Sequence, residues 1–340
     1  MRLTSKFTTL AAGAALAAST AFTAFAAEVT LTISSWAPPS HGVNAIIWPA
    51  MTKMIEEATN GRVTAEIKYG LTSPPAQYDL ILDGGADFAW IFHGYTPGRF
   101  VATKMIELPG YMGSAEAASV AYWRAHEKYF AGLNEHKGVK VAALMTHGEG
   151  VLHTSKDIKS LADINGMKLR IGGGVAGDTG AALGATGINV PAPKVYETLA
   201  SNAADGVMMP MEGKLSFKFY EVAKNTYTVP GGFYRGSFAI IMNQAAFDNL
   251  TADEQVALDK LFGENLSRVA GAAWDAMDAA GLGKLNAEAD NHLIEASAED
   301  IAAFNAIAAP IIDGVKAEVN ALGLNADEVQ AFIADQMKNY

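Results

Sequence analysis

Between residues 29 and 92, the apolar positions of the chain alternate between strand-like and helix-like spacing. The strand-like segments are short and rich in β-branched or other apolar residues, and the segments between them repeat apolar residues every three or four positions. The expected elements are a strand at 29–35, a helix at 43–59, a strand at 63–69, a helix at 76–83 and a strand at 86–92. Apolar strands that alternate with amphipathic helices indicate a parallel sheet covered on both faces.

The same alternation restarts after a helical stretch at residues 115–130. The expected elements are strands at 139–145, 167–171 and 206–209 and a helix at 179–183. Thr251 and Glu254 then form a capping box, which predicts a long helix that runs toward residue 277 with one apolar stripe. We therefore expect a second α/β lobe, with this helix as the candidate bridge between the two lobes.

The amino-terminal residues have the pattern of an export signal. Arg2 and Lys6 precede an apolar stretch at residues 7–25, and Ala24-Phe25-Ala26 has the small-x-small pattern that a signal peptidase accepts. The stretch is short for a membrane span, and the cleavage pattern follows it at once. Residues 1–26 are therefore predicted to be a signal peptide, and the expected location is the periplasm.

Composition narrows the possible functions. The chain has no cysteine, which excludes disulfides, thiolate nucleophiles, cysteine-ligated metals and a lipid anchor at the cleavage site. The formal charge is −11, and removal of Arg2 and Lys6 with the signal peptide takes away two positive charges and leaves −13. Such an acidic surface disfavours nucleic acid. Just over 300 residues remain, more than one hydrophobic core usually supports, so two lobes are expected.

A glycine-rich turn has the formal spacing of a dinucleotide-binding fingerprint. Gly172, Gly174 and Gly177 follow a predicted strand, and Glu197 comes about twenty residues later. The strand lies mid-chain, however, an arginine precedes the turn, and the signal peptide lacks the twin arginines that export folded, cofactor-loaded enzymes. We expect no cofactor, and an oxidoreductase built on this turn is a distant alternative.

The histidines do not form a recognisable metal motif. His147, Glu149 and His153 come closest, but their H-x-E-x-x-x-H spacing is not that of a zinc protease. The chain also lacks a G-x-S-x-G elbow for a serine nucleophile. We therefore expect no metal, no catalytic residues and no enzymatic activity.

Arg170 is the residue most indicative of ligand binding. It lies in an otherwise apolar strand and is followed at once by three glycines. A salt bridge between the lobes is the structural explanation for such a residue. The functional explanation is a guanidinium that faces a cleft and holds a carboxylate with two parallel hydrogen bonds, at the strand ends where α/β sheets bind ligands.

Several aromatic and histidine side chains gather at strand ends or in loops. They are Trp36, Trp90, Phe92, His93, Tyr95, Phe233 and Tyr234. Core or surface packing explains any one of them by itself. Together they could form the walls of a small-molecule cleft, because amphipathic rings combine apolar contact with hydrogen bonding.

Several segments resemble the solute-binding proteins of tripartite ATP-independent periplasmic (TRAP) transporters, in their DctP-type branch. The matching segments are Asp83-Gly84-Gly85-Ala86-Asp87-Phe88-Ala89-Trp90, Gly94-Tyr95-Thr96-Pro97-Gly98-Arg99-Phe100, Leu108-Pro109, Asp163-Ile164-Asn165-Gly166-Met167-Lys168-Leu169-Arg170, Tyr196-Glu197-Thr198-Leu199 and Asp205-Gly206. Their order and spacing hold across nearly the whole chain after the signal peptide. The segments together are specific to this family.

The resemblance implies an α/β, two-lobed periplasmic binding protein fold, in which crossing strands and a long bridging helix join the lobes around a ligand cleft. The expected division is residues 27–146 plus 236–274 in lobe I and residues 147–235 plus 275–340 in lobe II. The implied function is capture of a small organic solute for import driven by an ion gradient. The implied partners are TRAP membrane subunits, and we expect a monomer. A binding protein for an ATP-driven importer is an alternative with the same two-lobed architecture.

The resemblance also implies that Arg170 holds a ligand carboxylate. The chain departs from the family where many members carry a second contact to that carboxylate: Met209 replaces an asparagine, and segment 148–152 lacks an arginine. Glu149 and Glu212 stand nearby, so an amine or zwitterion is an alternative ligand. The expected ligand-binding residues are Arg170, Trp36, Phe92, His93, Tyr95, His147, Glu149, Met209, Glu212 and Phe233.

Overall fold

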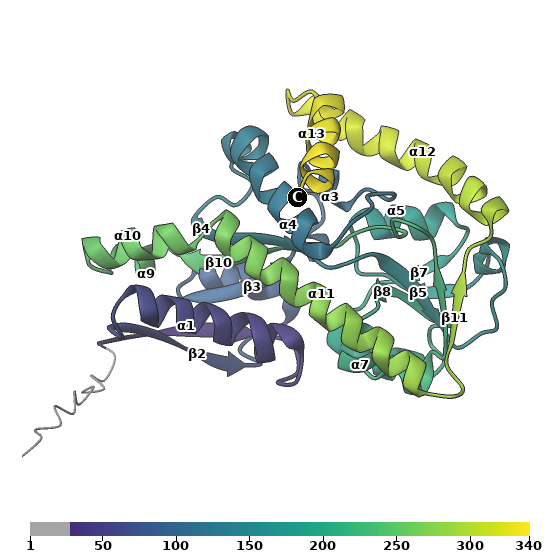
Figure 1. The fold of residues 1–340 in the computed structure, drawn as a ribbon, viewed down its shortest axis with the longest axis horizontal. Coiled ribbons are helices and arrows are strands. Elements are labelled where there is room, and N and C mark those ends of the chain that lie inside the picture. Colours follow the sequence, from purple (N-terminus) through teal and green to yellow (C-terminus); the bar gives the residue numbers. More distant parts are fainter. Residues whose placement is uncertain (1–27) are drawn as a thin grey trace, which may run out of the picture.

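The computed structural model describes residues 28–340, which form two β-sheets flanked by helices (Figure 1). The predicted signal peptide at residues 1–26 lies outside the described residues. Each sheet is the centre of one lobe. The first lobe is defined here by the sheet that contains β1, and the second lobe by the sheet that contains β5. The predicted two-lobed α/β fold is confirmed.

The sheet of the first lobe has the strand order β2-β1-β3-β10-β4. Its strands are β1 (Val29–Ser35), β2 (Val63–Tyr69), β3 (Phe88–Phe92), β4 (Val139–Thr146) and β10 (Ser237–Asn243). β1 pairs in parallel with β2 and β3, whereas β10 runs antiparallel to β3 and β4. The four strands predicted in this lobe are confirmed within two residues, and β10 was not predicted.

The sheet of the second lobe has the strand order β11-β9-β5-β8-β6-β7. Its strands are β5 (Gly150–Thr154), β6 (Lys168–Arg170), β7 (Thr186–Ile188), β8 (Gly206–Pro210), β9 (Asn225–Thr228) and β11 (His292–Glu295). β5 is antiparallel to both β8 and β9, and β6 lies parallel between β7 and β8. Only β6 and β8 were predicted here.

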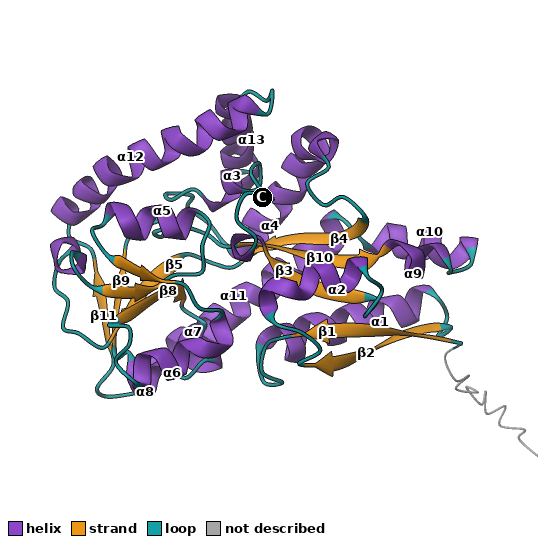
Figure 2. Cartoon of the chain, turned by 180° about the vertical axis from the view of Figure 1, so that it is seen from behind, coloured by secondary structure: helices purple, strands orange, loops and turns teal. Residues whose placement is uncertain are grey.

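Helices cover both sheets (Figure 2). They are α1 (Trp48–Ala58), α2 (Gln77–Leu82), α3 (Lys104–Glu107), α4 (Ala115–Ala125), α5 (Val175–Ala182), α6 (Val195–Ala200), α7 (Gly213–Ser216), α8 (Phe219–Val222), α9 (Gln244–Asp248), α10 (Ala252–Leu261), α11 (Glu264–Ala287), α12 (Ala298–Ala321) and α13 (Ala326–Lys338). The short helical segment η1 (Val43–Ile47) precedes α1, and the short helical segment η3 (His93–Tyr95) follows β3. Across residues 28–340, none of the helices has the length and apolar character needed to cross a membrane.

Two of the passages of the chain between the two sheets are hydrogen-bonded to each other. The first passage joins β4 to β5, and the second joins β9 to β10. The Gly150 amide donates to the Tyr234 carbonyl at 2.8 Å, and the Phe233 amide donates to the Gly150 carbonyl at 2.9 Å. A Cβ at Gly150 would lie 2.3 Å from the Tyr234 ring, so this close approach requires glycine. The two passages form the hinge region between the lobes.

The predicted long helix is two helices in the structure. α10 ends at Leu261, and α11 begins at Glu264 after Gly263, which has φ 83°. The chain leaves the helical conformation at Phe262, which is extended, and the positive φ of the next residue favours glycine. A Cβ at Gly263 would also lie 2.9 Å from Trp123. α11 contacts α4 and β4 in the first lobe and α7 in the second, so the predicted bridging role belongs to α11 (Figure 1).

The carboxyl-terminal helices connect the two lobes on the opposite side (Figure 2). α12 contacts α5 of the second lobe and α3 of the first, and α13 packs against α4 and α3. The predicted boundary between residues 274 and 275 falls inside α11. The division of the chain into residue ranges for each lobe stays a prediction.

The contact of α11 with the second lobe depends on a small residue at Gly281. A Cβ there would lie 2.2 Å from the Met211 carbonyl oxygen and 2.8 Å from the Glu212 Cα. We expect Gly281→Ala to lower the free energy of unfolding by about 1–2 kcal/mol, because backbone atoms cannot move aside cheaply. Denaturant titration followed by circular dichroism measures this change.

Gly283→Ala is the matched control on the same helix. Nothing lies within 4 Å of a Cβ at Gly283, and the position is exposed. Alanine should stabilise this helix by about 0.5–1 kcal/mol through its higher helix propensity. Equal effects of the two substitutions would contradict the proposed close contact at Gly281.

Candidate ligand-binding site

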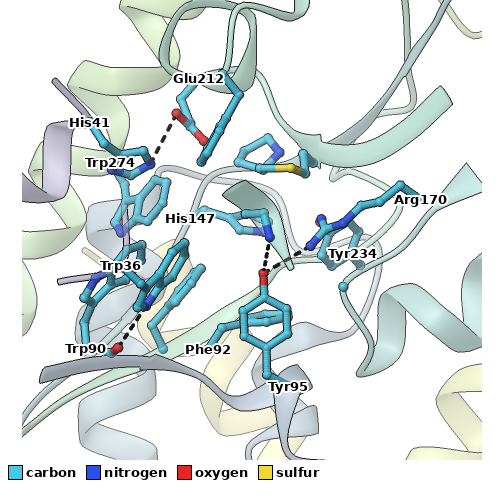
Figure 3. Close-up of a pocket in the computed structure, with 16 residues that line it drawn as sticks. Trp36, His41, Trp90, Phe92, Tyr95, His147, Arg170, Glu212, Tyr234 and Trp274 are labelled. Carbon is cyan, nitrogen blue, oxygen red and sulfur yellow. Dashed lines mark hydrogen bonds and ion pairs between the residues drawn. The ribbon is translucent and has the colours of Figure 1, made fainter. Parts of the chain in front are cut away.

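A pocket of about 430 Å³, part of it open to solvent, lies between the two lobes (Figure 3). Seven of the predicted residues line it: Trp36, Phe92, Tyr95, His147, Arg170, Met209 and Glu212. Residues of both lobes therefore meet at the same cavity, as a ligand site between lobes requires.

Arg170 ends β6, and its guanidinium lies beside Tyr95 of the first lobe (Figure 3). Its Nε donates to the Val190 carbonyl at 2.7 Å, and its Nη2 donates to the Tyr95 hydroxyl at 3.1 Å. The residue is 3% exposed, and no carboxylate of residues 28–340 forms an ion pair with it. Its contact between the lobes is thus a hydrogen bond, and the salt bridge considered from the sequence does not form among these residues.

Tyr95 is positioned by both lobes. It ends η3, directly after β3, and its ring packs edge-on against Phe92 at a centroid distance of 4.9 Å. Its hydroxyl accepts hydrogen bonds from Arg170 and from the Ala192 amide, the latter at 2.8 Å. Tyr95 therefore links the first lobe to two segments of the second and holds the Arg170 side chain in place.

Stacked aromatic rings form one wall of the pocket. Trp36 follows β1 and stacks on Trp90 of β3, with ring centroids 3.9 Å apart and planes 10° apart. The Trp36 Nε1–H donates to the Trp90 carbonyl at 3.2 Å. Phe238 of β10 stacks on Trp90 and on Trp274 of α11. The wall is thus rigid and apolar, and the indole N–H of Trp36 already has a hydrogen-bond acceptor.

Glu212 and His41 lie on another side of the pocket (Figure 3). Glu212 directly precedes α7, and His41 lies in the loop after β1. Each side chain is 1% exposed, and His41 Nε2 is 3.7 Å from Glu212 Oε2. Neither carboxylate oxygen of Glu212 has a hydrogen-bond partner within residues 28–340. The pocket therefore contains a buried acidic side chain, Glu212, as well as the basic side chain of Arg170.

His147 is a neutral side chain in the passage between β4 and β5. Its Nδ1 donates to the Gly148 carbonyl at 2.7 Å. Burial lowers the pKa of His147 to about 3, and the nearby Arg235 adds to this fall. The imidazole therefore stays uncharged in the periplasm, and it contributes shape and a neutral ring nitrogen to the pocket.

Asp278 of α11 supports the segment that carries Glu212. Its Oδ1 accepts a hydrogen bond from the Glu212 amide at 2.8 Å. Burial raises the pKa of Asp278 to about 8; the hydrogen bond from that amide opposes the rise, while the charges of Glu212 and Asp275 add to it. Asp278 is consequently mostly protonated at neutral pH.

Three predicted residues do not line the pocket. His93 is hydrogen-bonded to Ser237 and His136, each at 2.9 Å. Phe233 is fully buried and packs edge-on against Phe304 at 5.1 Å. Glu149 is partly exposed, and its position in the loop before β5 puts it outside the lining. We leave these three residues out of the proposed site.

Several lining residues were absent from the predicted set. They are His41, Trp90, Gly172, Ala192, Pro210, Phe217, Tyr234, Phe238 and Trp274. Trp90 and Tyr234 belonged to the aromatic group noted in the sequence. His41 lies in a Pro-rich loop directly after a strand, and this position could have marked it as a candidate site residue. Trp274 lies in the apolar stripe of a helix, where a core residue and a pocket residue look alike in the sequence.

The glycine turn packs against the first lobe. A Cβ at Gly174, which has φ 64°, would lie 2.4 Å from Glu107 Oε2. The first amide of α5, at Val175, donates to this same oxygen at 3.0 Å. A pyrophosphate would need that helix amino terminus. Because a carboxylate occupies it, the geometry does not support a dinucleotide site.

His153, one of the residues considered as a possible metal motif in the sequence, makes other contacts. His153 is fully buried, and its ring nitrogens contact the Thr226 hydroxyl and the Pro210 carbonyl, each at 3.0 Å. Within residues 28–340 no group of three or more histidine, aspartate or glutamate side chains is arranged to hold a metal ion.

Comparison with known proteins identifies the family. A sequence model of DctP, described as bacterial extracellular solute-binding protein family 7, matches residues 34–318. The chain belongs to this family. Its location is therefore periplasmic, its function is to bind a small organic solute for a TRAP transporter, and its partners are the membrane subunits of that transporter. The alternative of a binding protein for an ATP-driven importer is not favoured.

Three solved structures of TRAP solute-binding proteins are similar over nearly the whole chain. One from Bordetella bronchiseptica, with bound (R)- and (S)-mandelate, is 36% identical with a TM-score of 0.88, covering 91% of this chain and 99% of that chain. One from Rhodoferax ferrireducens, with copurified benzoate, is 28% identical with a TM-score of 0.85, covering 91% and 98%. One from a marine metagenome, with 3-hydroxybenzoate, is 30% identical with a TM-score of 0.86, covering 93% and 99%.

The raised pKa of Asp278 predicts how stability depends on pH. Because the folded state binds this proton more tightly than the unfolded state, the stabilising contribution is complete below about pH 4 and is lost as pH rises to about 8. Asp278→Asn keeps an oxygen acceptor for the Glu212 amide and does not titrate. We expect similar melting temperatures near pH 4 and a higher melting temperature for the variant at pH 8–9.

Circular dichroism melts between pH 4 and pH 9 measure this difference. Asp313→Asn, at an exposed position on α12, is the matched control and should show no such dependence on pH. A constant gap between Asp278→Asn and the original protein across this range would contradict the assigned role of Asp278.

Proposed function

We propose that the protein binds an aromatic monocarboxylate in the cleft between its lobes and releases it chemically unchanged to the TRAP membrane subunits. The observation that carries this proposal is the environment of Arg170. Its buried guanidinium has no carboxylate partner within residues 28–340, and it lines a pocket whose other walls are largely aromatic. A buried cation without an ionic partner is costly, and an anionic ligand would remove that cost.

The hydrogen-bonding capacity of Arg170 supports a carboxylate ligand. A guanidinium has five N–H donors, and two of them are used by Val190 and Tyr95. Nη1 has no hydrogen-bond partner within residues 28–340, so donors remain for a ligand. Because Nε and Nη2 are held in place, the remaining donors have a fixed direction, which suits the planar carboxylate group.

The pocket walls support an aromatic body for the ligand. Trp36, Phe92 and Tyr95 come from the first lobe, and Phe217 and Tyr234 come from segments of the second lobe or the passage between lobes. Rings of this kind favour the faces and edges of another ring. The mandelate, benzoate and 3-hydroxybenzoate found in three similar proteins are all aromatic monocarboxylates, which agrees with this proposal.

The proposed binding residues are the predicted residues that line the pocket, with Arg170 as the carboxylate contact. We also propose the lobe division at 27–146 plus 236–274 and 147–235 plus 275–340. We also propose that the protein catalyses no reaction. The members of its family and its structural neighbours are binding proteins, which supports this proposal. An amine or a zwitterion as the ligand is not favoured.

Arg170→Ala should weaken the binding of benzoate by about a hundredfold or more. The substitution removes charge-assisted hydrogen bonds of about 1.5–3 kcal/mol and leaves the ligand carboxylate without a partner in a desolvated cleft. Arg170→Lys should recover little, because an ammonium cannot make two parallel bonds to one carboxylate. Isothermal titration calorimetry measures the affinities.

Arg268→Ala is the matched control, since Arg268 lies on the outer face of α11 and is about half exposed. Its affinity should equal that of the original protein. Thermal melts separate lost binding from lost folding, because Arg170→Ala removes two hydrogen bonds and should remain folded. Near-normal affinity of Arg170→Ala would refute the proposed carboxylate contact.

A further inference from the structure

Glu212 is a buried acidic group whose hydrogen-bonding capacity is unused. Its side chain is 1% exposed, it lines the pocket, and neither carboxylate oxygen has a hydrogen-bond partner within residues 28–340. Buried polar groups without partners are costly and are therefore rare in folded proteins. The position of Glu212 in a ligand pocket suggests that a bound molecule supplies the missing donor.

His41 leaves the Glu212 carboxylate available to a ligand. The Val43 amide donates to His41 Nδ1 at 3.2 Å, so in the neutral ring the proton is on Nε2. Nε2 faces Glu212 Oε2 at 3.7 Å, which is too long for a hydrogen bond. His41 therefore provides favourable electrostatics on one side of Glu212 without satisfying its oxygens.

Trp274 adds an unused donor to the same pocket. Its indole Nε1 is buried and has no hydrogen-bond partner within residues 28–340. Its ring packs edge-on against His41, with centroids 5.9 Å apart. The pocket thus contains an acceptor, Glu212, and a donor, Trp274, that both lack partners.

We infer that Glu212 accepts a hydrogen bond from a hydroxyl group on the ligand, so that the pocket takes a ring-hydroxylated aromatic carboxylate. This inference rests on the proposed function, because it assumes that Arg170 holds the carboxylate. Repulsion between Glu212 and the ligand carboxylate favours that orientation. Figure 3 shows Arg170 and Glu212 on different sides of the pocket, so one ligand can contact them with opposite ends.

A hydroxyl group fits the two unused groups better than an ammonium group does. A hydroxyl both donates and accepts, so it can donate to Glu212 and accept from Trp274. An ammonium only donates, and it would leave the Trp274 N–H unsatisfied. Phe238 also stacks on both Trp90 and Trp274, which leaves less free ring face in the pocket for a cation.

Calorimetric titration with four probes tests this inference: benzoate, 3-hydroxybenzoate, 4-hydroxybenzoate and 4-(aminomethyl)benzoate. At least one hydroxybenzoate should bind the original protein about tenfold to a hundredfold more tightly than benzoate, the range expected for a charge-assisted hydrogen bond. Glu212→Leu, which has no acceptor, should abolish this preference, and Glu212→Gln should reduce it. The preference is the ratio of the hydroxybenzoate and benzoate affinities in the same protein, so any change in benzoate affinity caused by loss of the Glu212 charge cancels, and measurable benzoate binding by each variant shows that the pocket is intact.

Glu149→Gln is the matched control, because Glu149 is a nearby acidic residue outside the pocket lining, and it should keep the preference. A preference that persists in Glu212→Leu, or equal affinity for benzoate and both hydroxybenzoates, would overturn the inference while leaving aromatic carboxylate binding in place. Tightest binding of 4-(aminomethyl)benzoate would also overturn the hydroxyl assignment. Failure of all four probes to bind would refute the proposed function itself.

Discussion

The pairing of the two passages between the lobes is the constraint on which the site depends. Gly150 exchanges backbone hydrogen bonds with Phe233 and Tyr234, and this close contact leaves no room for a side chain at Gly150. Arg235 stabilises the same region: it is fully buried and donates to the carbonyls of Tyr111, Gly113 and His147. Because this hinge region carries His147 and Tyr234 into the pocket, its geometry determines how the two lobes face each other.

The two lobes contribute complementary halves of the pocket. The first lobe supplies stacked tryptophans and Tyr95, and the second supplies Arg170 and Glu212. Tyr95 joins the halves, since its hydroxyl accepts hydrogen bonds from Arg170 and Ala192. α11 spans both lobes and brings Trp274 and Asp278 to the site. A ligand that contacts both halves would therefore favour the arrangement of the lobes seen here.

Local patterns predicted the regular elements well where strands and helices alternate along the chain. β1, β2, β3 and β4 were expected within two residues, because their apolar and β-branched runs are bounded by Pro, Gly or helical segments. β5, β9 and β10 were missed. They lie next to the passages between the lobes, and their pairing partners lie far away in sequence, so no short turn joins them to a partner. The break at Gly263 was missed because the apolar stripe continues across it.

The sequence by itself determined the α/β class and the family, and it predicted Arg170 as a ligand contact, since a charge inside an apolar strand needs a partner whatever the fold. Only the tertiary structure decided which other residues share the pocket with it. Glu149 and Glu212 look equivalent in the sequence, yet Glu212 lines the pocket and Glu149 does not. His41 and Trp274 reach it from a loop and a helix more than two hundred residues apart. Such proximity follows from packing between lobes, which local spacing does not encode.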